Sequence, residues 1–207
     1  MSIKSVMGTE TEFGITSRAE GFDPVSSSIF LVNHLRPFSS LKVLWDYENE
    51  DPLVDARGFT VDGERERPAQ EANLSLNKPL ENGGRLYIDG AHPEYSTPEC
   101  VTPRDVVIYE KAGEKLLQVC IENANRVRKE EDKLFVYKNN TDTKGNSYGY
   151  HENYLMLRST AFGKIVQNLT PFLVTRQIYA GSGKVGTDNK ADPADFQISQ
   201  QIGRAHV

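Results

Sequence analysis

Residues 85–100, RLYIDGAHPEYSTPEC, combine three carboxylates, one histidine and two tyrosines within sixteen positions. Side chains alternate between two faces in an extended segment, so Arg85, Tyr87 and Asp89 are predicted to project from one face. The two aliphatic residues between them, in RLYID, would then pack behind the strand. Half of this segment is therefore expected to serve the core, and the other half is available for a chemical site.

A second pair of carboxylates, Glu10 and Glu12 in TETE, also lies two residues apart and so on one face of a strand. Glu94 follows Asp89 after a turn, so these acids converge if the two strands adjoin. A divalent metal ion would offset their mutual repulsion. Oxygen ligands with an occasional histidine suit Mg²⁺ or Mn²⁺ better than Zn²⁺. Arg85 on the same face could clamp a phosphate group with two hydrogen bonds.

Ordinary structural explanations compete with this hypothesis. Alternating acids are typical of the solvated face of a strand, and tyrosine or histidine beside acids is compatible with a hydrogen-bonded sheet edge. His151, taken alone, is compatible with a strand histidine that binds no metal. Residues 181–186, GSGKVG, lack the GxxxxGK[ST] spacing of a phosphate-binding loop, which favours a flexible turn.

The strands that would hold these residues can be read from apolar alternation. One of them, over residues 92–99, is expected to be interrupted by Pro93 and Pro98. Residues 45–80 are polar with little periodicity, which predicts an ordered loop followed by a mobile one. The predicted strands are 4–16, 84–90, 92–99, 134–141 and 147–157.

Three helices are predicted, over residues 26–36, 103–130 and 170–181. The first is opened by a serine cap and ended by Pro37; the third is capped by Thr170 with Pro171 at its start. Each has the local signals of a helix boundary. In the second helix, Thr102 is the expected cap, Pro103 takes the first helical position, Asp105 completes a capping box, and the inner stripe is Val106, Gly113, Leu117, Cys120, Ala124 and Val127.

Composition narrows the class of protein. The chain has 207 residues, of which 38% are hydrophobic and 26% charged, so it can bury a core. A net charge of -5 without a run of lysine or arginine argues against a nucleic-acid binder or a binder of anionic membranes. No stretch has the length of a membrane span or the apolar core of a signal peptide, so the cytoplasm is the expected location. Cys100 and Cys120 are expected to be reduced and structural.

The order of strands and helices, without strict βαβ alternation, favours an α+β fold with an antiparallel sheet. Four blocks of sequence also resemble, in the same order, the family that contains the Pup ligase and the Pup deamidase/depupylase. These blocks are GTETEFG (8–14), NGGRLYIDGAHPEYSTPEC (82–100), YKNNTDTKGNSYGYHENYLM (137–156) and PFLVTRQIYAGSGKVG (171–186).

That family is related to glutamine synthetase and other carboxylate-amine ligases. The resemblance implies a curved antiparallel sheet that forms a cradle, packed on helices, with Mg²⁺-ATP held at one end. It also implies a smaller C-terminal domain that is missing here, so residues 1–200 are expected to be a partial N-terminal catalytic domain, inactive alone. Residues 201–207 are expected to be a non-native tail, because IGRAHV is the translation of the start of a common sequencing adapter.

Two segments resemble the deamidase/depupylase branch more than the ligase branch: residues 44–59 and residues 196–200. In that branch a mobile loop, expected here around residues 58–76, lies near the active site. The resemblance implies deamidation of the C-terminal glutamine of Pup and hydrolysis of the isopeptide bond between Pup and a target lysine, with ATP bound as a cofactor. Pup and pupylated proteins are then the expected partners. A Pup-protein ligase and a non-catalytic Pup-binding scaffold are the alternatives.

The resemblance also assigns roles to single residues. Asp89 matches the catalytic aspartate, acting as a nucleophile or as a base. Gly90 departs from the family, where a bulkier residue is common, so the backbone beside Asp89 is expected to be looser. The implied metal-binding residues are Glu10, Tyr87 and Glu94, the implied nucleotide-binding residues are Arg85 and Thr97, and we add Glu12, Glu99 and His151 as metal or phosphate neighbours.

Overall fold

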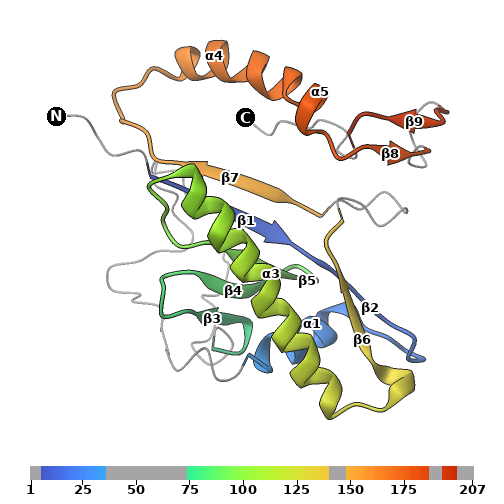
Figure 1. Cartoon of the computed structure of the whole chain (residues 1–207). Coiled ribbons are helices and arrows are strands. Elements are labelled where there is room, and N and C mark those ends of the chain that lie inside the picture. The colour runs from blue at the N-terminus through green and yellow to red at the C-terminus, as the bar shows by residue number, and fades with distance from the viewer. Residues whose placement is uncertain (1–5, 36–73, 140–147, 187–192, 200–207) are drawn as a thin grey trace, which may run out of the picture.

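The computed structural model describes residues 6–35, 74–139, 148–186 and 193–199 (Figure 1). Its centre is a five-stranded antiparallel sheet in the order β3-β4-β5-β1-β7. Two further strand pairs, β2-β6 and β8-β9, are also antiparallel. The central strands are β1 (Met7–Glu12), β3 (Asn77–Pro79), β4 (Arg85–Asp89), β5 (His92–Ser96) and β7 (Tyr150–Tyr154). The outer pairs are β2 (Gly14–Ser17) with β6 (Leu134–Tyr137), and β8 (Lys184–Val185) with β9 (Phe196–Gln197).

Two helices, α1 (Pro24–Asn33) and α3 (Pro103–Arg126), pack on one face of the central sheet (Figure 1). Their inner side chains meet those of the strands in one core, which confirms the expected α+β class. The core residues are Phe13, Leu31, Val32, Leu35, Leu80, Leu86, Tyr95, Leu117, Cys120, Ala124 and Leu134.

Further helices are η1 (Glu130–Asp132), α4 (Phe162–Thr175) and α5 (Gln177–Ala180). The amphipathic helix α4 lies beyond β7, away from α1 and α3 (Figure 1), and none of its residues is buried. No helix within the described ranges is both long and apolar enough to cross a lipid bilayer.

The start of α3 agrees with its sequence signals. The Thr102 hydroxyl accepts a hydrogen bond from the Asp105 backbone amide at 3.1 Å and donates one to the Asp105 carboxylate at 2.7 Å. The helix ends at Arg126, however, and not at residue 130, so Val127 is exposed and not part of the inner stripe. Gly113, Leu117, Cys120 and Ala124 are buried as predicted, Val106 is half-buried, and Glu110 is buried although no apolar pattern included it.

Several other predicted boundaries were wrong. The strand expected over residues 4–16 is divided at Phe13, whose side chain is buried in the core. The strand that follows, β2, belongs to a different sheet. Helix α1 is capped by Asp23, whose carboxylate accepts a hydrogen bond from the Ser26 amide at 2.8 Å, and it ends at Asn33. Residues 77–79, expected in a loop, form β3. Residues 36–73 lie outside the described residues. They include most of the expected mobile loop and the segment 44–59 that resembles the deamidase/depupylase branch.

Two prolines behave differently from the prediction. Pro93 lies within β5 and does not interrupt it, because β1 pairs only with Glu94–Ser96 and the Pro93 carbonyl still accepts a hydrogen bond from the Phe13 amide at 2.9 Å. Pro171 lies inside α4, so Thr170 does not cap that helix. The helix tolerates the missing amide on an exposed surface.

Candidate metal and active site

The order of the sheet brings the predicted site residues together, because β5 lies between β4 and β1. The strands of the two acidic segments, β1 and β5, pair directly, which meets the condition for their acids to converge. Their polar side chains occupy two adjacent rows that cross the strands on the face opposite α1 and α3. The first row consists of Tyr87, Glu94 and Glu12, and the second of Arg85, Ser96, Glu10 and His151.

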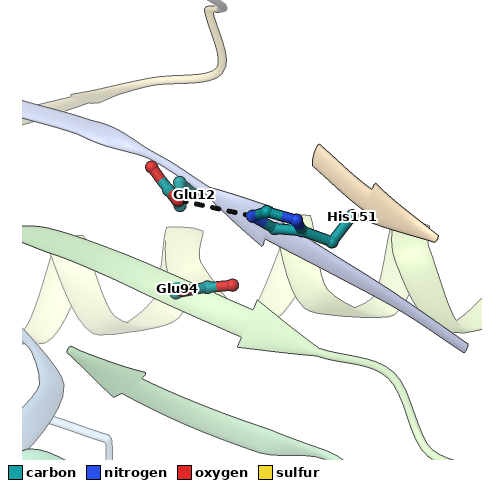
Figure 2. A group of neighbouring side chains, drawn as sticks. All are labelled: Glu12, Glu94 and His151. Atoms are coloured by element: carbon teal, nitrogen blue, oxygen red, sulfur yellow. Dashed lines mark ion pairs between the residues drawn. The ribbon is translucent and has the colours of Figure 1, made fainter. Parts of the chain in front are cut away.

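Three of these residues form a group with the geometry of a metal site. Glu12 of β1, Glu94 of β5 and His151 of β7 each present one ligand atom, and the three atoms lie within 4.8 Å of one another (Figure 2). The Nε2 atom of His151 is 3.7 Å from Oε1 of Glu12. Two carboxylates and one imidazole are a donor set that suits Mg²⁺ or Mn²⁺.

Burial makes Glu94 the electrostatically unusual member of this group. Its exposed fraction is only 2%, and no lysine or arginine within the described residues forms an ion pair with it. Burial raises the pKa of Glu94 to about 7; a hydrogen bond from Tyr87 opposes the rise, and the negative charges of Glu12, Glu10 and Asp89 add to it. A bound divalent cation would supply the positive charge that this carboxylate lacks.

The backbone of Gly149 passes close to the group. A Cβ atom placed on Gly149 would be 2.7 Å from Nε2 of His151 and 2.8 Å from Oε1 of Glu12, so a side chain here would push against both ligand atoms. The Gly149 carbonyl also accepts a hydrogen bond from the Glu12 amide at 3.0 Å, which fixes the glycine next to β1. The donor set, the uncompensated Glu94 and a glycine that does not crowd the ligand atoms fit a divalent metal ion.

His92 is a site residue that the sequence did not identify. Its Nδ1 atom is 3.0 Å from Oε2 of Glu12, and its ring packs edge-on against Tyr148 with 4.7 Å between the ring centroids. The available signal was the alternation of β5, which places His92 on the same face as Glu94. His92 therefore contacts Oε2 of Glu12, while the other carboxylate oxygen, Oε1, lies near His151.

Arg85 and Tyr87 lie side by side on the site face of β4. The Arg85 guanidinium carbon is 3.9 Å from the centre of the Tyr87 ring, and no ion pair of the described residues includes Arg85. Burial raises the pKa of the Tyr87 phenol, so this hydroxyl stays protonated and can donate to Glu94. Arg85 is therefore a cation on the site face with its charge still available for an anionic ligand.

Asp89 is the exposed last residue of β4, and its register partner is His92. Between these two residues lies a two-residue turn in which Gly90 has a φ of 56°. Because such turns require a positive φ, Gly90 serves the hairpin that presents Asp89. The reactive carboxylate predicted from the sequence thus stands at the open end of the same face as the metal group.

The structure does not bring every predicted residue into this group. The Thr97 side chain is buried, where its hydroxyl accepts a hydrogen bond from the Thr9 backbone amide at 3.0 Å. Glu99 is exposed and lies outside the three-residue group. Glu10 is in the adjacent row, with Oε1 3.5 Å from the Ser96 hydroxyl. Their roles in metal or nucleotide binding stay predictions.

Comparisons with known proteins agree on one family. Residues 5–206 match the model of the family described as Pup-ligase protein. A depupylase of Acidothermus cellulolyticus is 46% identical over 208 residues, which cover 95% of this chain and 40% of that protein. A Pup deamidase/depupylase of Mycobacterium tuberculosis is 44% identical over 96% of this chain and 41% of its own length.

A ligase and a solved complex also match. A Pup-protein ligase of Kineococcus radiotolerans is 39% identical over 88% of this chain and 34% of its own length. The crystal structure of the complex between prokaryotic ubiquitin-like protein Pup and its ligase PafA matches with a TM-score of 0.70 and 29% identity, covering 95% of this chain and 34% of that chain. The chain therefore spans about two fifths of the length of the depupylases that it matches.

Proposed function

The chain belongs to the Pup-ligase protein family, and on that premise we propose that the full-length protein is a Pup deamidase/depupylase. It would hydrolyse the side-chain amide of the C-terminal glutamine of Pup, and the isopeptide bond between Pup and a lysine of a target protein. The two depupylase relatives described above, from Acidothermus cellulolyticus and Mycobacterium tuberculosis, align over 95% and 96% of this chain. A cytoplasmic location stays a prediction of the sequence.

The observation that carries this proposal is the joint placement of Asp89 and the metal group on one face of the sheet. Glu12, Glu94 and His151 can hold a divalent cation, and Asp89 stands at the end of the neighbouring strand. Glu10, Tyr87 and Glu99 are proposed as further metal neighbours, while Arg85 and Thr97 would contact ATP. Mg²⁺ bound with ATP would supply positive charge that stabilises an oxyanion.

The residues of this chain would carry out the rest of the reaction. Asp89 either attacks the amide carbon itself or takes a proton from the water molecule that attacks it. A carbon–oxygen bond forms and the carbon–nitrogen bond breaks. In the base route, the nitrogen leaves with the proton that Asp89 took from water. In the nucleophile route, the nitrogen takes its proton from solvent, and a water molecule then hydrolyses the anhydride between Asp89 and the substrate, which frees Asp89. The leaving group is ammonia from glutamine or the amine of lysine. Hydrolysis of this kind does not require ATP to be consumed.

A ligase is the second candidate, because ligases also match closely. A Pup-protein ligase of Acidimicrobium ferrooxidans is 52% identical, although over only 115 residues and 54% of this chain. A ligase would activate a glutamate carboxyl group of Pup at the expense of ATP and join it to a lysine. The longer alignments with the depupylases favour the hydrolase.

The test uses the full-length protein, with Mg²⁺-ATP and Pup that ends in glutamine, followed by intact mass. Loss of the terminal amide is expected for the native protein. Asp89→Asn should abolish this loss while nucleotide binding is retained, because the substitution removes one charge and little volume. Retained cleavage in the variant would refute the role of Asp89. Attachment of glutamate-ended Pup to lysines, with one ATP consumed per bond, would assign the protein to the ligases.

A further inference from the structure

A buried carboxylate lies behind the sheet, on the face opposite the candidate site. Glu110 projects from α3, and its exposed fraction is 9%. Its two oxygens accept separate hydrogen bonds from β1: the Thr9 hydroxyl donates to Oε2 at 3.0 Å, and the Thr11 hydroxyl donates to Oε1 at 2.7 Å. Both threonines are buried, so these bonds are shielded from water.

The two threonines alternate along β1 with two acids of the site. Because side chains point to opposite faces in turn, Thr9 and Thr11 face the helix while Glu10 and Glu12 face the candidate site. One carboxylate therefore holds β1 from behind at two points, on either side of Glu10 and directly before Glu12. A shift of this strand relative to α3 would move both acids.

The charge of Glu110 is compensated on its own side of the sheet. Nζ of Lys138, just after β6, lies 2.7 Å from Oε1 of Glu110 and 2.8 Å from Oε1 of Glu114, one helical turn further along α3. Glu114 also pairs with Lys111 at 2.9 Å. Lys138 thus balances the charge of Glu110, which does not depend on the metal group for this.

We propose that Glu110 is a positioning residue for the metal site. Through Thr9 and Thr11 it fixes β1, and thereby the distance of the Glu12 carboxylate from Glu94 and His151. Ligands of a metal site must be held to within roughly 0.5 Å of the productive geometry, and supporting hydrogen bonds supply that accuracy. The inference rests on the proposed function, because it requires that this group binds a divalent cation.

The test measures Mn²⁺ binding to the 207-residue chain from the electron paramagnetic resonance signal of free Mn²⁺. Glu110→Gln should weaken binding on the order of tenfold to a hundredfold, the range seen when residues that support metal ligands are changed. Glu114→Gln is the matched control: it neutralises another acid of α3 that binds Lys138 but does not touch β1. Its Mn²⁺ affinity should equal that of the native chain.

A milder variant keeps the test decisive if Glu110→Gln does not fold. Thr11→Val removes the 2.7 Å bond with little change of shape, and it should weaken Mn²⁺ binding less than Glu110→Gln. The two changes combined should cost less than the sum of their separate effects, because they act through one contact. Native Mn²⁺ affinity in folded Glu110→Gln or Thr11→Val, with only the unfolding free energy lowered, would overturn the positioning role. Absence of Mn²⁺ binding to the native chain would overturn both this inference and the proposed metal site.

Discussion

Glu94 is buried on the site face without a lysine or arginine partner among the described residues, and this has a consequence for stability. Its pKa is about 7 in the folded chain, above the ordinary 4.5. A carboxyl whose folded pKa is raised contributes stability below its unfolded pKa, and that contribution is lost as the pH rises through the folded value. Between pH 4.5 and 7 the metal-free chain should therefore lose stability through Glu94.

The substitution Glu94→Gln removes this titration and nearly preserves shape. The unfolding free energy of the variant, minus that of the native chain, should rise by about 2.5 kcal/mol between pH 5 and pH 8, because the pKa of Glu94 is about 7 in the folded chain and 4.5 ordinarily. Urea denaturation in EDTA at the two pH values measures it. Because a bound cation favours the ionised carboxylate, Mn²⁺ should stabilise the native chain at pH 8 and not the variant. An equal difference at both pH values would contradict the assigned cause.

At the scale of elements, the contact between α3 and β5 depends on one glycine. A Cβ atom on Gly113 would overlap the ring of Tyr95, which is buried and cannot move aside. Gly113→Ala gains about 1 kcal/mol of helix propensity but overpacks the core, which costs about 1–3 kcal/mol, so a net loss of stability is expected. Urea denaturation checks it. Gly163→Ala in α4 should cause no loss, because the added carbon would meet no atom within 4 Å apart from the neighbouring backbone of its own helix.

Local sequence predicted some elements well, because their signals act over a few residues. Thr102 and Pro103 marked the start of α3, and the alternation in RLYID identified the two faces of β4. The same pair of residue types at Thr170 and Pro171 failed, since α4 begins earlier and runs through the proline. A threonine before a proline is compatible with a helix start, but this pair of residues cannot show whether a helix has already begun at an earlier residue.

The candidate site was predictable only in part, for a related reason. Alternation placed Glu10 and Glu12 on one face, but only the strand order brought them to Glu94 and His151. Pairing between strands far apart in sequence is set by the whole core and leaves no local pattern. His92 and Glu110 were missed on this account. Alternation along β5 puts His92 on the face of Glu94, but its contact with Glu12, and the contacts of Glu110 with Thr9 and Thr11, depend on how β1 pairs and packs.

At the scale of the whole molecule, the part of the chain after β7 differs from the rest. No residue of α4 or α5 is buried, although both helices carry large apolar side chains. At the end of α4, Arg176 forms an ion pair with Glu152 of β7 at 2.9 Å, which links this part of the chain to the sheet. An apolar surface of this extent is unusual for a monomer in water. The chain also spans only 40% of the length of its Acidothermus relative.

The 207-residue chain should therefore bind the dye ANS, which reports exposed apolar surface. Replacement of Val174 and Ile178, whose exposed fractions are 69% and 77%, by lysine should lower ANS fluorescence without changing the unfolding free energy of the core. Val107→Lys, at an exposed position of α3, is the control and should leave the fluorescence unchanged. If further chain covers this surface in the full-length protein, the unsubstituted full-length protein should bind ANS weakly. The two lysine substitutions should then lower its unfolding free energy, because burying charge is costly. Equal ANS binding by both forms would show that no additional segment covers α4.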